Sequence, residues 1–215
     1  MLKHALNLDM VILPGDSAWP APLSLAVAFN EVVLIEGAGL AVSSPLLEVA
    51  STLAPPLAGH VRHWGRDAAT RRRERLFRLR RRIAYISPQQ VLLHLFSLAE
   101  NIALGPCYYQ GCSEAEALAP HADLLEHLEL KAHLTQKPTQ VSKAIYARAV
   151  WARELVKGPE LILAAIFGEF ATTAGAGGMT EQTRKDPRQG GVWIRCAPRR
   201  PGPRPHVFKT FNQTL

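Results

Sequence analysis

The stretch VVLIEGAGLAVSS, residues 32–44, joins an apolar run to a glycine-bearing loop and then to a helix-like segment. A continuous run of branched apolar residues such as Val32 to Ile35 predicts a buried strand. Loops between a strand and a helix place backbone N–H groups where nucleotide phosphates bind. The segment therefore predicts an α/β fold with a candidate phosphate loop at 37–44, although this loop contains no lysine.

Outward from this stretch, apolar runs and helical patterns alternate along the chain. The expected helices cover residues 45–54, 71–82, from 113 toward 130, and 142–157, and residues 91–104 are expected to be helical or partly helical. The expected strands cover residues 22–35 with a tight turn near Asn30, 83–86, 161–166 and 191–195. This alternation predicts a mainly parallel sheet. The proline- and arginine-rich residues 196–215 are expected to form no regular element.

Composition narrows the class of protein. The chain has 215 residues, of which 47% are hydrophobic, which suits one α/β domain with a small extension. The sequence contains no run of about 18 uncharged apolar residues, so it predicts no membrane-spanning helix. The first 22 residues lack the layout of a signal peptide, so we expect a cytoplasmic protein. Cys107 and Cys112 are expected to be ordinary thiols, and His60 with His63 to be structural, because neither pair has enough partners for a metal site.

Positive charge is concentrated in one segment. Residues 71–82 read RRRERLFRLRRR within a chain of net charge +7. The segment predicts a helix with one apolar stripe and an arginine-covered remainder. Such a surface suits an acidic partner or anionic lipid, and a merely solvated face is the alternative. The lack of interleaved aromatic residues disfavours nucleic acid. The candidate partner or lipid contacts are Arg71, Arg72, Arg73, Arg75 and Arg78.

Three segments together resemble the nucleotide-binding subunit of ATP-binding-cassette (ABC) transporters. They are RRIAYISPQQVLLHLFSLAENIALG (81–105), SEAEA (113–117) and ARAVWARELVKGPELIL (147–163). The resemblance covers about residues 5 to 210. It implies a P-loop NTPase-like core over 1–170 with a mainly parallel sheet and a helical subdomain at about 88–157. Residues 171–215 are then a Gly/Pro/Arg-rich C-terminal segment with one core strand at 191–195.

The first family motif is altered at its charged position. The Walker A pattern G-x-x-x-x-G-K-[ST] aligns with residues 37–44. Gly37 and Ser44 match, and Gly39 lies within the loop, but Val42 replaces the second glycine and Ser43 replaces the lysine. The lysine holds the β- and γ-phosphates, so its loss removes the main attraction for nucleotide. The candidate nucleotide-binding residues that remain are Gly37, Gly39, Ser43 and Ser44.

The other family motifs are altered too. The signature LSGGQ aligns with residues 141–145, where Ser142 matches but Lys143 and Ala144 replace the glycine pair. The Walker B strand should end in Asp-Glu, and the chain has Ala165 and Ile166 there, which can neither hold magnesium nor position water. Ala197 falls near the position of the switch histidine. The glutamine-loop position falls at Pro88, beside Gln89 and Gln90.

These departures predict a pseudo-ATPase: an ABC subunit without catalytic residues, cytoplasmic and peripheral to the membrane. The resemblance implies a membrane permease as partner and a second ABC subunit, as a homo- or heterodimer. No cofactor is predicted. One alternative is a divergent but active ATPase that binds ATP and Mg, with Arg66 or an arginine of 71–82 replacing the lysine. The other is a module that binds nucleic acid or anionic membrane through residues 71–82 and 195–204.

Overall fold

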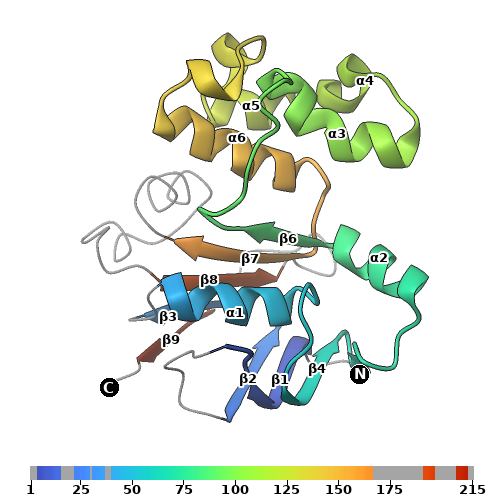
Figure 1. Cartoon of the computed structure of the whole chain (residues 1–215), viewed down its shortest axis with the longest axis vertical. Helices are drawn as coiled ribbons and strands as arrows, with labels where there is room; N and C mark the ends of the chain where they lie inside the picture. Colours follow the sequence, from blue (N-terminus) through green and yellow to red (C-terminus); the bar gives the residue numbers. More distant parts are fainter. Residues whose placement is uncertain are drawn as a thin grey trace. The chain divides into compact units, whose positions relative to one another are not determined.

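The computed structural model describes residues 4–15, 22–29, 31–36, 40–166, 191–196 and 207–212. The chain divides into two compact units. The first contains Met1–Tyr85, Pro159–Ala165 and Gln189–Leu215, and holds the strands (Figure 1). The second contains Ile86–Gly158 and Ile166–Arg188, and its described part is mostly helical.

The first unit contains a four-stranded sheet in the order β2-β1-β4-β5. All three pairings are antiparallel. Its strands are β1 (His4–Ile12), β2 (Leu23–Ala28), β4 (Ala58–His63) and β5 (Arg66–Asp67). In β2 buried and exposed residues alternate, as expected for a sheet with one solvent face. The sequence pattern predicted β2 but not β1, β4 or β5.

A close backbone approach in this sheet requires glycine at position 59. Gly59 has φ of +85°, and a Cβ there would lie 2.2 Å from the carbonyl oxygen of Met10. The register of β1 against β4 shifts between Asp9 and Ile12, so the two backbones converge at this irregularity. A side chain at position 59 would force the strands apart.

The second sheet has five strands in the order β6-β7-β8-β3-β9. Its strands are β3 (Glu31–Glu36), β6 (Ile83–Ile86), β7 (Leu161–Ile166), β8 (Gly191–Cys196) and β9 (Val207–Asn212). Val33, Ile35, Leu161 and Leu163 are almost completely buried, which confirms the buried strands read from the apolar runs. The turn near Asn30 falls on a residue outside the described part.

One prediction about this sheet was wrong, and another holds with one exception. The sheet is mainly parallel as predicted, but β8 runs antiparallel to β3, and in Figure 1 its arrow points opposite to those of β6 and β7. The direction of a strand depends on its connection, which its own residue pattern does not encode. In addition, residues 207–212 form β9, paired in parallel with β3, although no regular element was expected beyond residue 195. The proline-rich composition ends before Val207, and the alternating sequence VFKTFN suits a strand.

Two helices belong to the first unit: α1 (Leu40–Ala50) and α2 (Arg73–Arg81). α2 confirms the helix that was predicted at residues 71–82. α1 begins five residues before the predicted start at residue 45 and ends at 50 rather than 54, with Pro45 inside it. The proline was taken as a first-turn residue because it lacks a backbone donor. It instead lies inside the helix, past the first turn, and removes the one backbone hydrogen bond that its missing N–H would have made.

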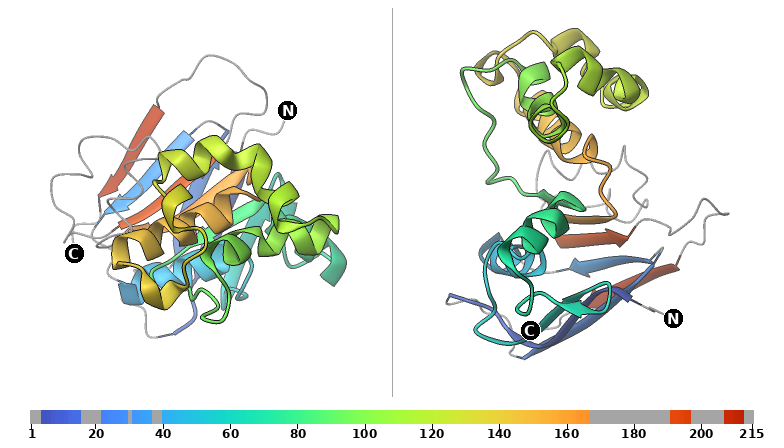
Figure 2. Two further views of the ribbon diagram at one scale, coloured as in Figure 1. Left: turned by 90° about the horizontal axis from the view of Figure 1, so that it is seen from above. Right: turned by 90° about the vertical axis from the view of Figure 1, so that its right-hand side faces the viewer.

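The second unit is built from four α-helices and three 3-10 turns among its described residues, which Figure 2 shows as one group. They are α3 (Leu98–Gln110), α4 (Glu114–Leu118), η1 (Ala119–His121), α5 (Ala122–His127), η2 (Lys131–His133), η3 (Pro138–Gln140) and α6 (Lys143–Leu155). The capping box of Ser113 with Glu116 and the helix α6 were predicted correctly. The helix predicted from 113 toward 130 is broken by η1, where Pro120 lies.

The segment 91–104, expected to be helical or partly helical, is helical only in its second half. α3 begins only at Leu98, after Ser97, which forms a capping box with Glu100. It extends to Gln110 and ends at Gly111 in the left-handed conformation. Residues 91–96 are irregular instead. In the described part of the chain, no helix is both long and apolar enough to cross a membrane.

Candidate functional site

The Walker A-like segment lies between β3 and α1. Because α1 begins at Leu40, only residues 37–39 separate the two elements, and Gly37 and Gly39 lie outside the described residues. Ser43 and Ser44 both belong to α1. Ser44 is buried, with 8% of its surface exposed. The structure therefore places one described hydroxyl of this motif inside a helix and mostly away from solvent.

The Walker B-like pair ends β7, which lies between β6 and β8 in the five-stranded sheet. Ala165 is completely buried, and its side chain is a methyl group. Ile166 is the last residue of the strand, and its side chain lies outside the described part. A methyl group supplies neither a metal ligand nor a base. Within the described ranges, no cluster of three or more His, Cys, Asp or Glu residues is arranged to hold a metal ion.

The signature-like residues begin α6. Ser142 is the N-cap, and its hydroxyl accepts a hydrogen bond from the Ile145 backbone N–H at 3.3 Å. Lys143 is exposed, and Ala144 is partly buried. Serine is one of the preferred helix caps, so the cap alone accounts for Ser142. Its match to the family motif does not require a nucleotide.

The glutamine-loop segment precedes a run of exposed apolar side chains. The side-chain oxygen of Gln90 is buried without a hydrogen-bond partner among the described residues, while Gln89 is exposed. After them, four large apolar side chains are exposed within six residues: Val91 61%, Leu93 47%, Leu95 83% and Phe96 37%. Four exposed apolar side chains in so short a segment indicate a contact surface.

A buried asparagine holds this segment in its irregular shape. Asn101 of α3 is 0% exposed, and its side-chain oxygen accepts the Leu93 N–H at 2.7 Å. Its amide group donates to the carbonyl oxygens of Leu93, Phe96 and Ser97 at 3.0, 3.3 and 2.8 Å. These bonds replace the helical hydrogen bonds that residues 91–96 would otherwise make. Sequence reasoning missed Asn101, and the only signal for it was a polar residue at an apolar position of the pattern.

Some arginines of residues 71–82 hold the segment to the first unit through hydrogen bonds and ion pairs, while others are exposed. Arg71 donates to the carbonyl oxygen of His63 at 3.0 Å, and Arg80 contacts Thr52 through its side chain. Arg82 binds both carboxylate oxygens of Glu160 at 2.6 Å and lies over the Trp64 ring at 3.9 Å. Burial, with the charges of Arg66 and Arg82, lowers the pKa of Arg71. Arg71, predicted as a partner contact, is therefore part of the set that anchors the helix.

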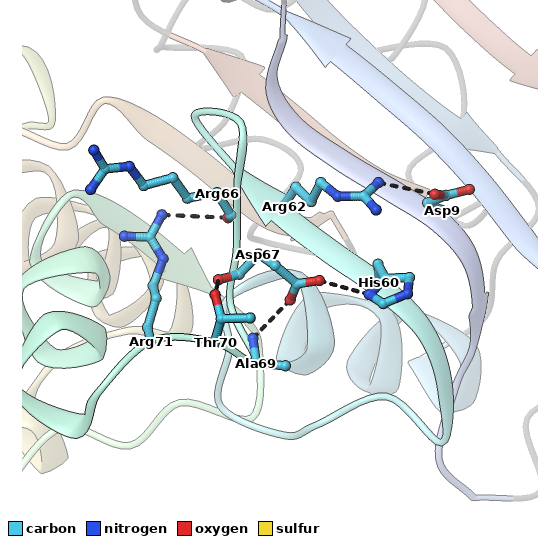
Figure 3. A network of polar contacts seen from close by, with 8 residues as sticks. All are labelled: Asp9, His60, Arg62, Arg66, Asp67, Ala69, Thr70 and Arg71. Atoms are coloured by element: carbon cyan, nitrogen blue, oxygen red, sulfur yellow. Dashed lines mark hydrogen bonds and ion pairs between the residues drawn. The ribbon is translucent and has the colours of Figure 1, made fainter.

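A network of polar contacts fixes the loop that leads into α2 (Figure 3). Asp67 accepts the Ala69 N–H at 2.8 Å and contacts His60 at 2.7 Å, and its backbone carbonyl accepts the Thr70 hydroxyl. Partial burial opposes ionisation of Asp67, but the hydrogen bonds from Ala69 and His60 outweigh it and lower its pKa. Arg62 pairs with Asp9 on the neighbouring strand at 2.9 Å. The start of the arginine segment thus has a defined position on the first unit.

No protein-family model matches the chain. The lipoprotein-releasing system ATP-binding protein LolD of Geobacter metallireducens is 33% identical over 143 residues, which cover 66% of this chain and 63% of that protein. The methionine import ATP-binding protein MetN of Xylella fastidiosa is 34% identical over 142 residues, which cover 66% of this chain and 42% of that protein. The chain thus spans less than two thirds of the length of these relatives.

Solved structures show the same fold. The ATP-binding cassette MJ0796, in a post-hydrolysis state bound to ADP and Pi, matches with a TM-score of 0.64 and 23% identity over 74% of this chain and 72% of that one. CbiO1 from Clostridium perfringens, part of the ABC transporter complex CbiONQ, matches with a TM-score of 0.60 and 16% identity over 74% of this chain and 64% of that one. Together with the sequence relatives, these matches show that the chain belongs to the ABC transporter ATP-binding subunits, with a P-loop NTPase core.

Proposed function

We propose that the chain is a non-catalytic ABC subunit that binds a membrane permease and hydrolyses no ATP. The observation that carries this proposal is Ala165, a completely buried methyl group at the end of β7. In the family, this position and the next carry the aspartate that helps to hold magnesium and the glutamate that positions the attacking water. The subunit would work at the cytoplasmic face of the membrane, paired with a second ABC subunit.

The residues present do not fit the ATP and magnesium that the family implies. Phosphoryl transfer depends on a cation that neutralises the developing charge and on a residue that positions the water. Ser44 offers one mostly buried hydroxyl, and Ala165 offers no oxygen. Ser142, the retained signature residue, already caps α6 through its hydroxyl. We therefore derive no catalytic step for this chain.

The apolar segment 91–96 supports the second half of the proposal, the contact with a permease. Leu95 is 83% exposed, and Val91, Leu93 and Phe96 are exposed beside it. An apolar surface held in one conformation loses little entropy when it binds. The four hydrogen bonds of Asn101 give this segment such a conformation before any partner arrives.

A divergent but active ATPase subunit is the second candidate. It is favoured by the match of Ser44 to the magnesium-binding serine of the family and by the 33% identity to an ATP-binding protein. In this reading, backbone amides of the segment after β3 bind phosphate, and an arginine replaces the lysine. Arg66 is the arginine to test, because it is exposed and its side chain forms no ion pair with another described residue.

ATP binding and phosphate release by the purified full chain with magnesium test the catalytic half. We expect no turnover above buffer and no binding at millimolar ATP. ATP turnover that disappears in Ser44→Ala would establish the second candidate. Ser142→Ala is the folding control, and it should lose turnover only in proportion to the fraction of the variant that is unfolded. Turnover that Ser44→Ala leaves unchanged points to a contaminating ATPase and leaves the chain itself inactive.

Photo-crosslinking on native membranes tests the permease contact. A photoreactive residue at Leu95 should give an adduct that mass spectrometry identifies as a polytopic permease. The same probe at Glu126, an exposed position of the same unit, is the matched control and should not give it. Equal adducts from both positions, or none from position 95, would refute the contact.

A further inference from the structure

We propose that α2 binds the anionic surface of a lipid bilayer through Arg72, Arg73, Arg75 and Arg78, with Phe77 inserting between the head groups. The proposal concerns a surface distinct from the permease contact, and it holds whether or not the chain hydrolyses ATP. A bilayer is chosen as the occupant because the exposed side chains of this helix combine dense positive charge with an exposed apolar ring.

The charge comes from the arginines that do not anchor the helix. Arg72, Arg73, Arg75 and Arg78 are exposed, and their side chains form no ion pair or hydrogen bond with another described residue. Glu74 is the only acidic residue of α2. Clusters of at least four cationic side chains on one helix are typical of surfaces that bind anionic lipid.

The orientation of α2 is fixed by the other arginines. Leu79 is buried, with 2% of its surface exposed, and Leu76 is partly buried on the same side. Arg80 reaches Thr52, and Arg82 reaches Glu160 and Trp64. The Asp67 network positions the loop before the helix (Figure 3). The exposed arginines are therefore presented by a fixed helix and not by a flexible tail.

Phe77 distinguishes a lipid surface from nucleic acid. Its ring is 50% exposed, and the guanidinium carbons of Arg73 and Arg80 lie 5.6 and 5.9 Å from its centre. A ring flanked by cations in this way is less open to a stacking base, and α2 offers no second aromatic residue. An exposed aromatic ring beside arginines is instead the pattern of helices that lie in the head-group region.

Vesicle sedimentation tests the proposal with the full chain. We expect binding to vesicles that contain phosphatidylglycerol, no binding to pure phosphatidylcholine, and weakening as salt increases. Arg75→Gln with Arg78→Gln should weaken binding about 25-fold, at roughly five-fold per arginine. Phe77→Ala should weaken it about three- to ten-fold, with little change in salt dependence.

A charge-matched variant separates position from net charge. Lys131→Gln with Lys137→Gln removes the same two charges from exposed positions of the other unit and should bind as the parent does. Equal losses in both double variants would overturn the assignment to α2. So would tighter binding to a single- or double-stranded oligonucleotide than to anionic vesicles at the same salt concentration, or no vesicle binding at low salt.

Discussion

The helices α2 and α6 are both rich in charged residues, yet the structure holds them in different ways. In α6 a continuous apolar face is buried, including Val150 and Trp151, with alanines around them. In α2 only Leu79 is fully buried, and arginine side chains tie the helix to its neighbours. Burial of apolar area is insensitive to salt, whereas ion pairs are screened. The comparison therefore predicts one helix that depends on packing and one that depends on polar contacts.

The largest expected effect is in α6. Trp151 is 3% exposed, so Trp151→Ala should leave a cavity and lower the free energy of unfolding by about 3–5 kcal/mol. Urea denaturation would measure this loss, and amide hydrogen exchange would locate it in α6. Tyr108→Ala, at a residue 81% exposed, is the control and should change stability by less than about 0.5 kcal/mol. A loss below about 1 kcal/mol at Trp151 would contradict the packing account.

The second effect depends on pH and tests the buried contact between His63 of β4 and Ala50 of α1. His63 is completely buried, and its Nε2 donates to the Ala50 carbonyl oxygen at 2.7 Å, while Nδ1 has no partner among the described residues. Burial lowers its pKa from 6.5 to about 4. The unfolded chain therefore binds a proton that the folded chain does not. Stability is full above pH 6.5 and should fall by roughly 3 kcal/mol as pH drops toward 4.

Urea denaturation at several pH values measures this dependence. His63→Gln retains a donor for the Ala50 carbonyl but does not titrate. It should flatten the pH curve between 6.5 and 4 even if it is less stable at neutral pH. The same slope in the parent and in the variant would show that another group causes the acid sensitivity.

Both helices were predicted from the sequence, because each has apolar residues at helical spacing. The strands β6 and β7 were predicted for a similar reason, as short apolar runs bounded by breakers. The pattern failed where a single side chain overrides it. Residues 91–96 have a helical sequence pattern, but the buried side-chain amide of Asn101 forms hydrogen bonds with the backbone groups of Leu93 and Phe96. No pattern in the sequence encodes which backbone groups the side chain of Asn101 will bind.

The candidate sites show the same limit. The serine of the signature-like motif was identified from the sequence, but its role as a helix cap required the geometry of α6. The arginine segment was predicted as one uniform surface, and only the contacts of Arg71, Arg80 and Arg82 divide it. The antiparallel pairing of β8 with β3 is not encoded in the residues of β8 itself. Local residue patterns thus predicted elements, while long-range contacts decided what each one does.

A smaller effect is expected for the anchoring arginine Arg82. Its ion pair with Glu160 is about half exposed, with side-chain exposures of 45% and 47%, so solvent screens it. With the stacking over Trp64, Arg82→Ala should cost about 1 kcal/mol of stability. Arg82→Lys keeps the charge but not the bidentate ion pair with Glu160, and should recover less than half of the stability that Arg82→Ala loses. Thermal melts at low and high salt would show whether the cost of Arg82→Ala shrinks as salt increases.

The smallest effect on stability is expected for Arg78, which is exposed and forms no ion pair with another described residue. Arg78→Gln should change the free energy of unfolding by less than about 0.5 kcal/mol. The same substitution should weaken binding to anionic vesicles about five-fold, whereas Arg82→Ala should change vesicle binding mainly to the extent that it unfolds α2. Two arginines of one segment would then act oppositely in the two assays. Because net charge falls equally in both variants, only the position of each arginine can explain that difference. If Arg78→Gln instead destabilised the fold as Arg82→Ala does, the division into anchoring and presented arginines would be wrong, and α2 would be a structural helix throughout.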